Sequence, residues 1–174
     1  QKPIWVAIFI ISFDLYWLIK TMFLAFHARA SWAHIQRNMQ TDWAGRLEAM
    51  RWDHLWQLVI LPSAGESVAV VKESIDSIVA ASWPKERMFV VLALEDKPEC
   101  HAIGEECEKL YKKNFGLFRL VYHPQEIQGE MRGKGANETW AIRAAREVVD
   151  KEKIPYENIL VSSFDIDTKL YPQN

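Results

Sequence analysis

From residue 54 onward, the chain alternates between short apolar runs and segments in which apolar residues recur at every third or fourth position. The short runs have the length of buried strands, and the recurring positions have the period of helices that pack through one face. Apolar strands that alternate with helices are typical of a parallel, doubly wound sheet. The pattern predicts an α/β domain over residues 54–174. The expected strands are 55–62, 87–96, 118–123 and 158–164, and the expected helices are 66–81, one that Pro98 opens, and 136–152.

A long apolar segment, residues 3–28, precedes this region. It is longer than the roughly 20 apolar residues that a bilayer-spanning helix needs. Asp14 and Lys20 interrupt it, and because they lie six residues apart they do not share a helix face. We expect a transmembrane helix over residues 1–29, with a buried helix of a soluble protein as the alternative.

The charges on either side of this segment predict its orientation in the membrane. Arginines follow it at positions 29, 37, 46 and 51, whereas only Lys2 precedes it. Cytoplasmic flanks of membrane helices carry an excess of Lys and Arg, so we expect the part after the segment on the cytoplasmic side.

Residues 30–53 form a connecting segment with apolar residues, two of them tryptophans, at helical spacing. This is the pattern of an amphipathic helix. It could lie along the lipid headgroups or pack on the following domain, and the sequence leaves both open.

Composition excludes some classes of function. Apolar residues make up 49% and charged residues 25% of the 174 residues, which is enough for a packed core. The net charge of -2 argues against a general nucleic-acid-binding protein, which usually carries a basic excess. The two cysteines, Cys100 and Cys107, are expected to be free thiols in a reducing compartment.

Two aspartates, Asp165 and Asp167, follow the last expected strand. In open α/β sheets, ligands bind beyond the C-terminal ends of the strands. Side chains alternate along an extended strand, so both carboxylates should point the same way. Two such carboxylates suit Mg²⁺ or Mn²⁺, which typically bridge a protein carboxylate and the phosphates of a substrate.

The segment GEMRGKGANETW, residues 129–140, combines three glycines and two cations just before a helix. Glycine lets the backbone approach a ligand, and a helix N-terminus with Arg132 or Lys134 favours an anion. The spacing is that of neither a Walker loop nor a dinucleotide fingerprint. A solvated loop with a capping glycine is the alternative.

Together these segments resemble the family-2 glycosyltransferases. VILPSAGES is similar to the first-strand motif V-I-P-x-Y-N-E, with Pro62 and Glu66 matching and Gly65 in place of Asn. The segment 74–96 resembles the S-L-x-S-L-x-A-Q-x-Y-P helix with its following strand. GKGANETWA resembles G-K-x-x-A-L-N-x-A, and VSSFDIDT resembles the metal-binding D-x-D motif. The resemblance extends from about Leu55 to Pro172.

This resemblance implies a GT-A fold, which is Rossmann-like with a mostly parallel sheet and flanking helices, and an inverting transfer from a nucleotide sugar, preferentially a UDP-sugar. It implies that Lys134 faces the diphosphate and that Asp165 and Asp167 hold Mg²⁺ or Mn²⁺. The sequence ALED replaces the commoner V-D-D-G-S, so whether Glu95 or Asp96 meets the base stays open. The implied nucleotide-sugar site is Pro62, Glu66, Glu95, Asp96, Gly133, Lys134, Asn137 and Asp165.

The family's catalytic base and acceptor elements are expected beyond residue 174, so we expect this chain alone to be inactive. The acceptor is not indicated by the sequence. Two other functions stay open. One is a non-catalytic, degenerate transferase domain that serves as a binding or assembly module in a membrane complex. The other is a nucleotidyltransferase, although PSAGES is a poor match to the glycine-rich first loop of that class.

Overall fold

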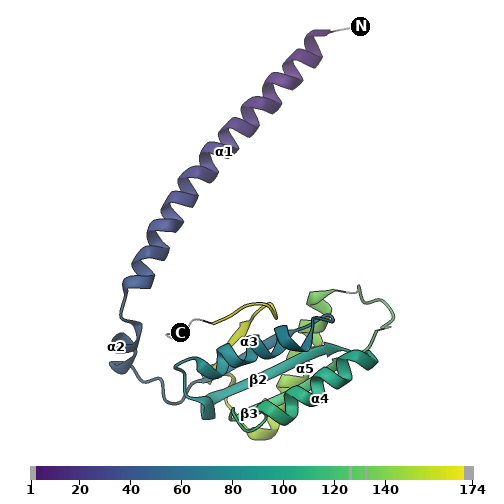
Figure 1. Cartoon of the computed structure of the whole chain (residues 1–174). Coiled ribbons are helices and arrows are strands. Elements are labelled where there is room, and N and C mark those ends of the chain that lie inside the picture. Colours follow the sequence, from purple (N-terminus) through teal and green to yellow (C-terminus); the bar gives the residue numbers. More distant parts are fainter. Residues whose placement is uncertain (1–2, 126, 132, 171–174) are drawn as a thin grey trace. The chain divides into compact units, whose positions relative to one another are not determined.

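The computed structural model of the chain describes residues 3–125, 127–131 and 133–170. The chain forms two units, Gln1–Arg51 and Trp52–Asn174 (Figure 1). The second unit begins at Trp52, close to the expected domain start at residue 54.

The first unit consists of the long helix α1 (Pro3–Gln40) and the short helix α2 (Trp43–Glu48). No residue of the described helix α1 is buried in the protein, and the helix is long and apolar enough to cross a membrane. It continues without a break across residue 29, where the expected transmembrane segment ended. The break falls at Asp42, whose Oδ1 accepts a hydrogen bond of 2.9 Å from the backbone N–H of Gly45 and so caps α2.

The second unit contains a parallel sheet. Its described strands are β1 (Trp56–Pro62), β2 (Met88–Glu95), β3 (Leu117–His123) and β4 (Ile159–Ser163), in the order β3-β2-β1-β4. Each neighbouring pair is parallel, with Gln57 opposite Met88 on one side and opposite Leu160 on the other. The predicted α/β fold with a parallel sheet and flanking helices is confirmed.

Helices cover both faces of the sheet. Helices α3 (Val68–Ala80) and α4 (Pro98–Tyr111) pack on one face, where Val71 and Cys107 join Val59 and Val90 of the central strands in one buried cluster. Helix α5 (Lys134–Glu152) packs on the other face through alanine and valine side chains at helical spacing. Its buried positions are Ala141, Ala145 and Val149. Short 3-10 turns at Lys85–Arg87 and Tyr156–Asn158 lead into β2 and β4.

The strand order fixes where a ligand can bind. The chain runs from β1 to β2 and β3 on one side and returns to β4 on the other side of β1. The strand order therefore changes direction between β1 and β4, and beyond the C-terminal ends of such a strand pair a ligand can bind.

Both cysteines are buried on α4, and neither is in a disulfide. Burial raises the pKa of the Cys107 thiol to about 11, so this thiol is protonated at neutral pH. The expected free thiols are thus confirmed, and they are core residues.

Candidate functional site

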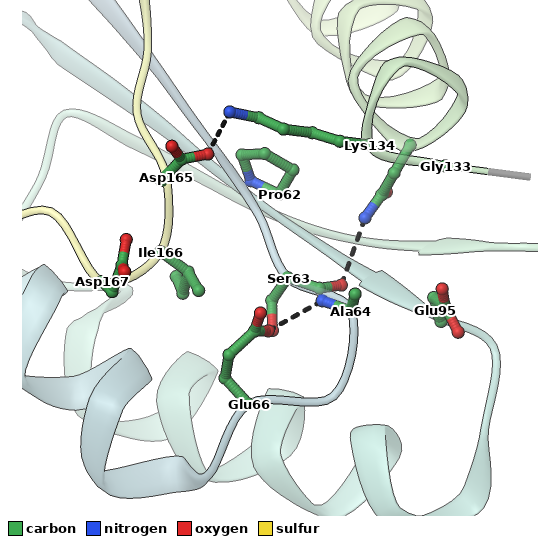
Figure 2. A pocket seen from close by; sticks show the side chains of 11 residues that line it. Pro62, Ser63, Ala64, Glu66, Glu95, Gly133, Lys134, Asp165, Ile166 and Asp167 are labelled. Carbon is green, nitrogen blue, oxygen red and sulfur yellow. Dashed lines mark hydrogen bonds and ion pairs between the residues drawn. The ribbon is translucent and has the colours of Figure 1, made fainter.

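A pocket of about 300 Å³ lies at the crevice beyond β1 and β4 (Figure 2). It is built by the loop after β1, the end of β2, the first turn of α5 and the turn after β4. Its lining residues are Pro62, Ser63, Ala64, Glu66, Glu95, Gly133, Lys134, Asn137, Asp165, Ile166 and Asp167. All of the predicted site residues except Asp96 are among them.

The loop after β1 is held by the carboxylate of Glu66. Its Oε2 accepts hydrogen bonds of 2.6 Å from the Ser63 hydroxyl and 2.8 Å from the backbone N–H of Ala64 (Figure 2). Gly65 has φ +123°, a conformation that L side chains rarely adopt. Glycine in place of the family's asparagine therefore suits the shape of this loop.

Hydrogen bonding keeps Glu66 ionised. Partial burial alone would raise the pKa of its carboxyl group, but the hydrogen bonds from Ser63 and from backbone N–H groups of the loop outweigh burial. The pKa of Glu66 is therefore lowered from its ordinary value of 4.5. The pocket carries a negative charge at this end.

Asn137 joins α5 to the ends of two strands. Its Nδ2 donates hydrogen bonds of 3.2 Å to the backbone oxygen of Ser63 and 3.0 Å to that of Ala93. The side chain is buried, and its Oδ1 has no hydrogen-bond partner among the described residues. Because both neighbours are acceptors, the amide nitrogen must face them. The two hydrogen bonds hold the first turn of α5, which also carries Lys134, against the strand ends.

Lys134 and Asp165 form an ion pair across the mouth of the pocket (Figure 2). Lys134 Nζ also lies 3.6 Å from Glu138 Oε1, one turn further along α5. Ser163, the last residue of β4, donates a hydrogen bond of 2.7 Å to the same Glu138 oxygen. The hydrogen bond to Asp165 raises the pKa of the Lys134 ammonium group, so Lys134 stays charged at neutral pH.

The two aspartates lie in a turn, not on an extended strand as the sequence suggested. Strand β4 ends at Ser163, and the backbone N–H of Thr168 donates a hydrogen bond of 2.8 Å to the backbone oxygen of Asp165. The buried side chain of Ile166 anchors the turn in the core between two exposed aspartates. The expectation of an extended strand at the two aspartates is wrong, because the chain leaves the sheet before Asp165, but both carboxylates line the pocket.

A divalent cation could be held here only with help from a ligand. No group of three or more His, Cys, Asp or Glu within the described part of the chain is arranged to hold a metal. Asp165 and Asp167 supply hard carboxylate oxygens at the pocket edge. This donor set fits Mg²⁺ or Mn²⁺ in the mode in which one or two carboxylates and the phosphates of a substrate share the ion.

Of the two acidic residues at the end of β2, Glu95 lines the pocket and Asp96 does not. Glu95 lines the pocket and pairs with Lys97. Asp96 does not line it, because its Oδ1 lies 2.7 Å from His101 Nε2 on α4. Glu95 is the last residue of β2, whereas Asp96 follows the strand and its side chain turns to α4. Of the two predicted candidates, the structure brings Glu95 to the site.

The glycine segment before α5 is tied to the sheet by a contact that the sequence did not suggest. The buried side chain of His123, at the end of β3, has its Nε2 3.0 Å from Glu130 Oε2. The ring centroid of Trp140 on α5 lies 5.7 Å from that of His123, and the two rings are almost perpendicular. Arg132, the other predicted cation of this segment, lies outside the described residues.

Sequence reasoning missed Ser63, Ala64 and Ile166 as pocket residues. The spacing of Ser63 and Glu66 was the one available signal, because a hydroxyl three residues before a carboxylate often bonds to it in a tight turn. Nothing in the sequence indicated that Lys134 and Asp165, 31 residues apart, would form an ion pair.

Comparison with known proteins gives low similarities. No family model matches the chain, and no curated protein matches it. It is similar to TarS of S. aureus, with a TM-score of 0.48 and 16% identity over 68% of this chain and 18% of that one. It is also similar to the mannosyltransferase PcManGT from Pyrobaculum calidifontis, solved in complex with GDP-Man and Mn²⁺, with a TM-score of 0.43 and 17% identity over 71% of this chain and 33% of that one. The chain thus spans well under two-thirds of either structure.

Proposed function

We propose that this chain is the nucleotide-sugar-binding part of a membrane-anchored, inverting glycosyltransferase of the family-2 type. The observation that carries the proposal is the convergence of four separate sequence segments on one pocket at the switch point of a parallel sheet. The segments are the loop after β1, the end of β2, the start of α5 and the turn after β4. Each of them contains one of the motifs that resemble the family.

The charges of the pocket suggest how the donor would lie. The cationic group of Lys134, beside the first turn of α5, suits the diphosphate, because helix N-termini and ammonium groups both favour phosphate. Glu95 and the loop of Glu66 lie on the far side from Asp165 and suit the nucleoside (Figure 2). A UDP-sugar is the preferred donor within this proposal.

Asp165 and Asp167 would hold Mg²⁺ or Mn²⁺ between the protein and the diphosphate. Such an ion would offset the negative charge that develops on the diphosphate as it leaves the sugar. The general base and the acceptor site would come from outside residues 1–174. Helix α1 would anchor the enzyme in the membrane with the α/β unit on the cytoplasmic side.

Calorimetric titration of the detergent-solubilised chain with UDP and with GDP, in Mn²⁺ and in EDTA, tests this function. Binding should be stronger in Mn²⁺, and Asp167→Asn should remove that difference. Asp53→Asn makes the same chemical change away from the pocket and should leave the difference between Mn²⁺ and EDTA unchanged. Binding that is equal in Mn²⁺ and EDTA would contradict the role of the metal. The absence of nucleotide binding would favour the alternative of a non-catalytic assembly module.

A further inference from the structure

Lys134 occupies the place next to Asp165 that a divalent cation would need. Its ammonium group contacts Asp165 Oδ1 and also lies 3.6 Å from Glu138 Oε1. An ion bound to the same Asp165 oxygen would place two positive centres within about 4 Å of each other, at a distance where they repel even in water. The Lys134 contact and a metal contact at Asp165 therefore compete.

The aspartates and the Lys134 side chain differ in how far they can move. Asp165 and Asp167 belong to a turn that is fixed by the Thr168 hydrogen bond and by the buried side chain of Ile166. Lys134 has a side-chain exposure of 48% and a flexible four-carbon stem at the first turn of α5. It can leave Asp165 by side-chain rotation alone, whereas the carboxylates stay where they are.

We propose that the diphosphate exchanges Lys134 for the divalent cation at Asp165, an inference that rests on the proposed function. The incoming phosphates attract the Lys134 ammonium group away from Asp165. Asp165 then joins Asp167 in holding the ion, whose remaining ligands are phosphate oxygens and water. Lys134 thus opposes binding of the ion alone and supports binding of the ion together with the diphosphate.

This exchange makes an unusual prediction about variants. Removing a charged residue from a binding pocket ordinarily weakens binding. Here Lys134→Met should strengthen binding of Mn²⁺ alone, because Asp165 no longer has a competing cation. Asp165→Asn should strengthen binding of UDP in EDTA, because Lys134 no longer has to leave a carboxylate. We expect gains of about three- to tenfold and about two- to fivefold, respectively.

The experiment uses the full chain in detergent micelles. Binding of Mn²⁺ alone is followed by the electron paramagnetic resonance signal of the unbound ion, and binding of UDP is followed by calorimetry with and without Mn²⁺. Lys72→Met is the matched control, because Lys72 forms an exposed ion pair of 3.2 Å with Glu106 and the substitution changes the net charge equally. Lys72 does not line the pocket, so Mn²⁺ affinity should not change.

The coupling between the two ligands gives a second readout. In the wild-type chain, UDP should tighten Mn²⁺ binding by the same factor by which Mn²⁺ tightens UDP binding, because coupling is reciprocal. In Lys134→Met, the factor by which each ligand tightens binding of the other should be at least about threefold smaller. If the wild type binds UDP but neither variant gains affinity, the exchange is wrong and the proposed function stands. If the wild type binds UDP neither with nor without Mn²⁺, both are overturned.

Discussion

Asn137 donates a hydrogen bond of 3.0 Å to the backbone oxygen of Ala93, and this contact fixes the start of α5 against the end of β2. The same amide also reaches the backbone oxygen of Ser63 at the end of β1. One side chain therefore bridges the two strand ends and the helix that carries Lys134. The geometry of the pocket depends on it.

Asn137→Ala should lower the free energy of unfolding by about 1–3 kcal/mol, because it leaves buried backbone acceptors without the amide donor. Urea unfolding of the solubilised chain, followed by tryptophan fluorescence, measures the change. Asn114→Ala removes the same side chain at an exposed position and should cost less than about 0.5 kcal/mol. Equal effects of the two substitutions would show that the strand-end contacts contribute nothing.

Glu66→Gln should destabilise the chain near neutral pH by about 1 kcal/mol, because the ionised carboxylate is the better acceptor for the Ser63 and Ala64 donors. The pKa of Glu66 is lowered in the folded state from 4.5, so its contribution is present above that pH and is lost as the pH falls through the folded pKa. The stability difference between wild type and variant should therefore shrink below about pH 4.5. A difference that grows on acidification would contradict the lowered pKa.

Gly65→Ala should destabilise the loop after β1 by about 1–3 kcal/mol, because of the positive φ at this position. No atom lies within 4 Å of the Cβ that alanine would add, so the cost would be conformational and not steric. Gly135→Ala is the control, because its Cβ also meets nothing within 4 Å but the residue lies in α5. That substitution should stabilise by about 0.5 kcal/mol. Thermal unfolding of both variants gives the comparison, and a stable Gly65→Ala protein would refute the conformational requirement.

Lys134→Ala should weaken UDP about fivefold and leave uridine almost unchanged, because the ammonium group would meet phosphate and not the base. The titrations are best made in EDTA, so that a metal ion does not contribute to the difference. An equal loss of affinity for UDP and uridine would show that Lys134 supports the structure of the loop and does not contact phosphate. No loss for either would remove it from the site.

Ser31→Cys should react with a membrane-impermeant maleimide only after intact cells are opened, because the arginines after the apolar part of α1 favour the cytoplasm. The native cysteines do not interfere, since both are buried and burial raises the pKa of their thiols. Pro3→Cys, at the other end of α1, should react from outside. Labelling of Ser31→Cys in intact cells would reverse the proposed orientation and with it the cytoplasmic donor site.

The elements of this protein could be predicted from sequence because each is encoded locally. Apolar runs such as 87–96 can be buried only as strands of a covered sheet, and the periodic apolar residues of 66–81 can face a core only as a helix. Pro98 marked the start of α4 through its own backbone restriction. The general place of the site followed as well, because the four strands of the described residues are parallel and their C-terminal ends share one edge.

The arrangement inside the site was decided by contacts between residues far apart in the chain. The sequence offered Glu95 and Asp96 as equal candidates, and only the end of β2 at Glu95 and the position of His101 distinguished them. The turn after β4 depends on burying Ile166 in a core that α3 and α4 help to form. The ion pair of Lys134 and Asp165 joins the start of α5, which Asn137 ties to the strand ends, to the turn after β4, and no local pattern encodes such a contact.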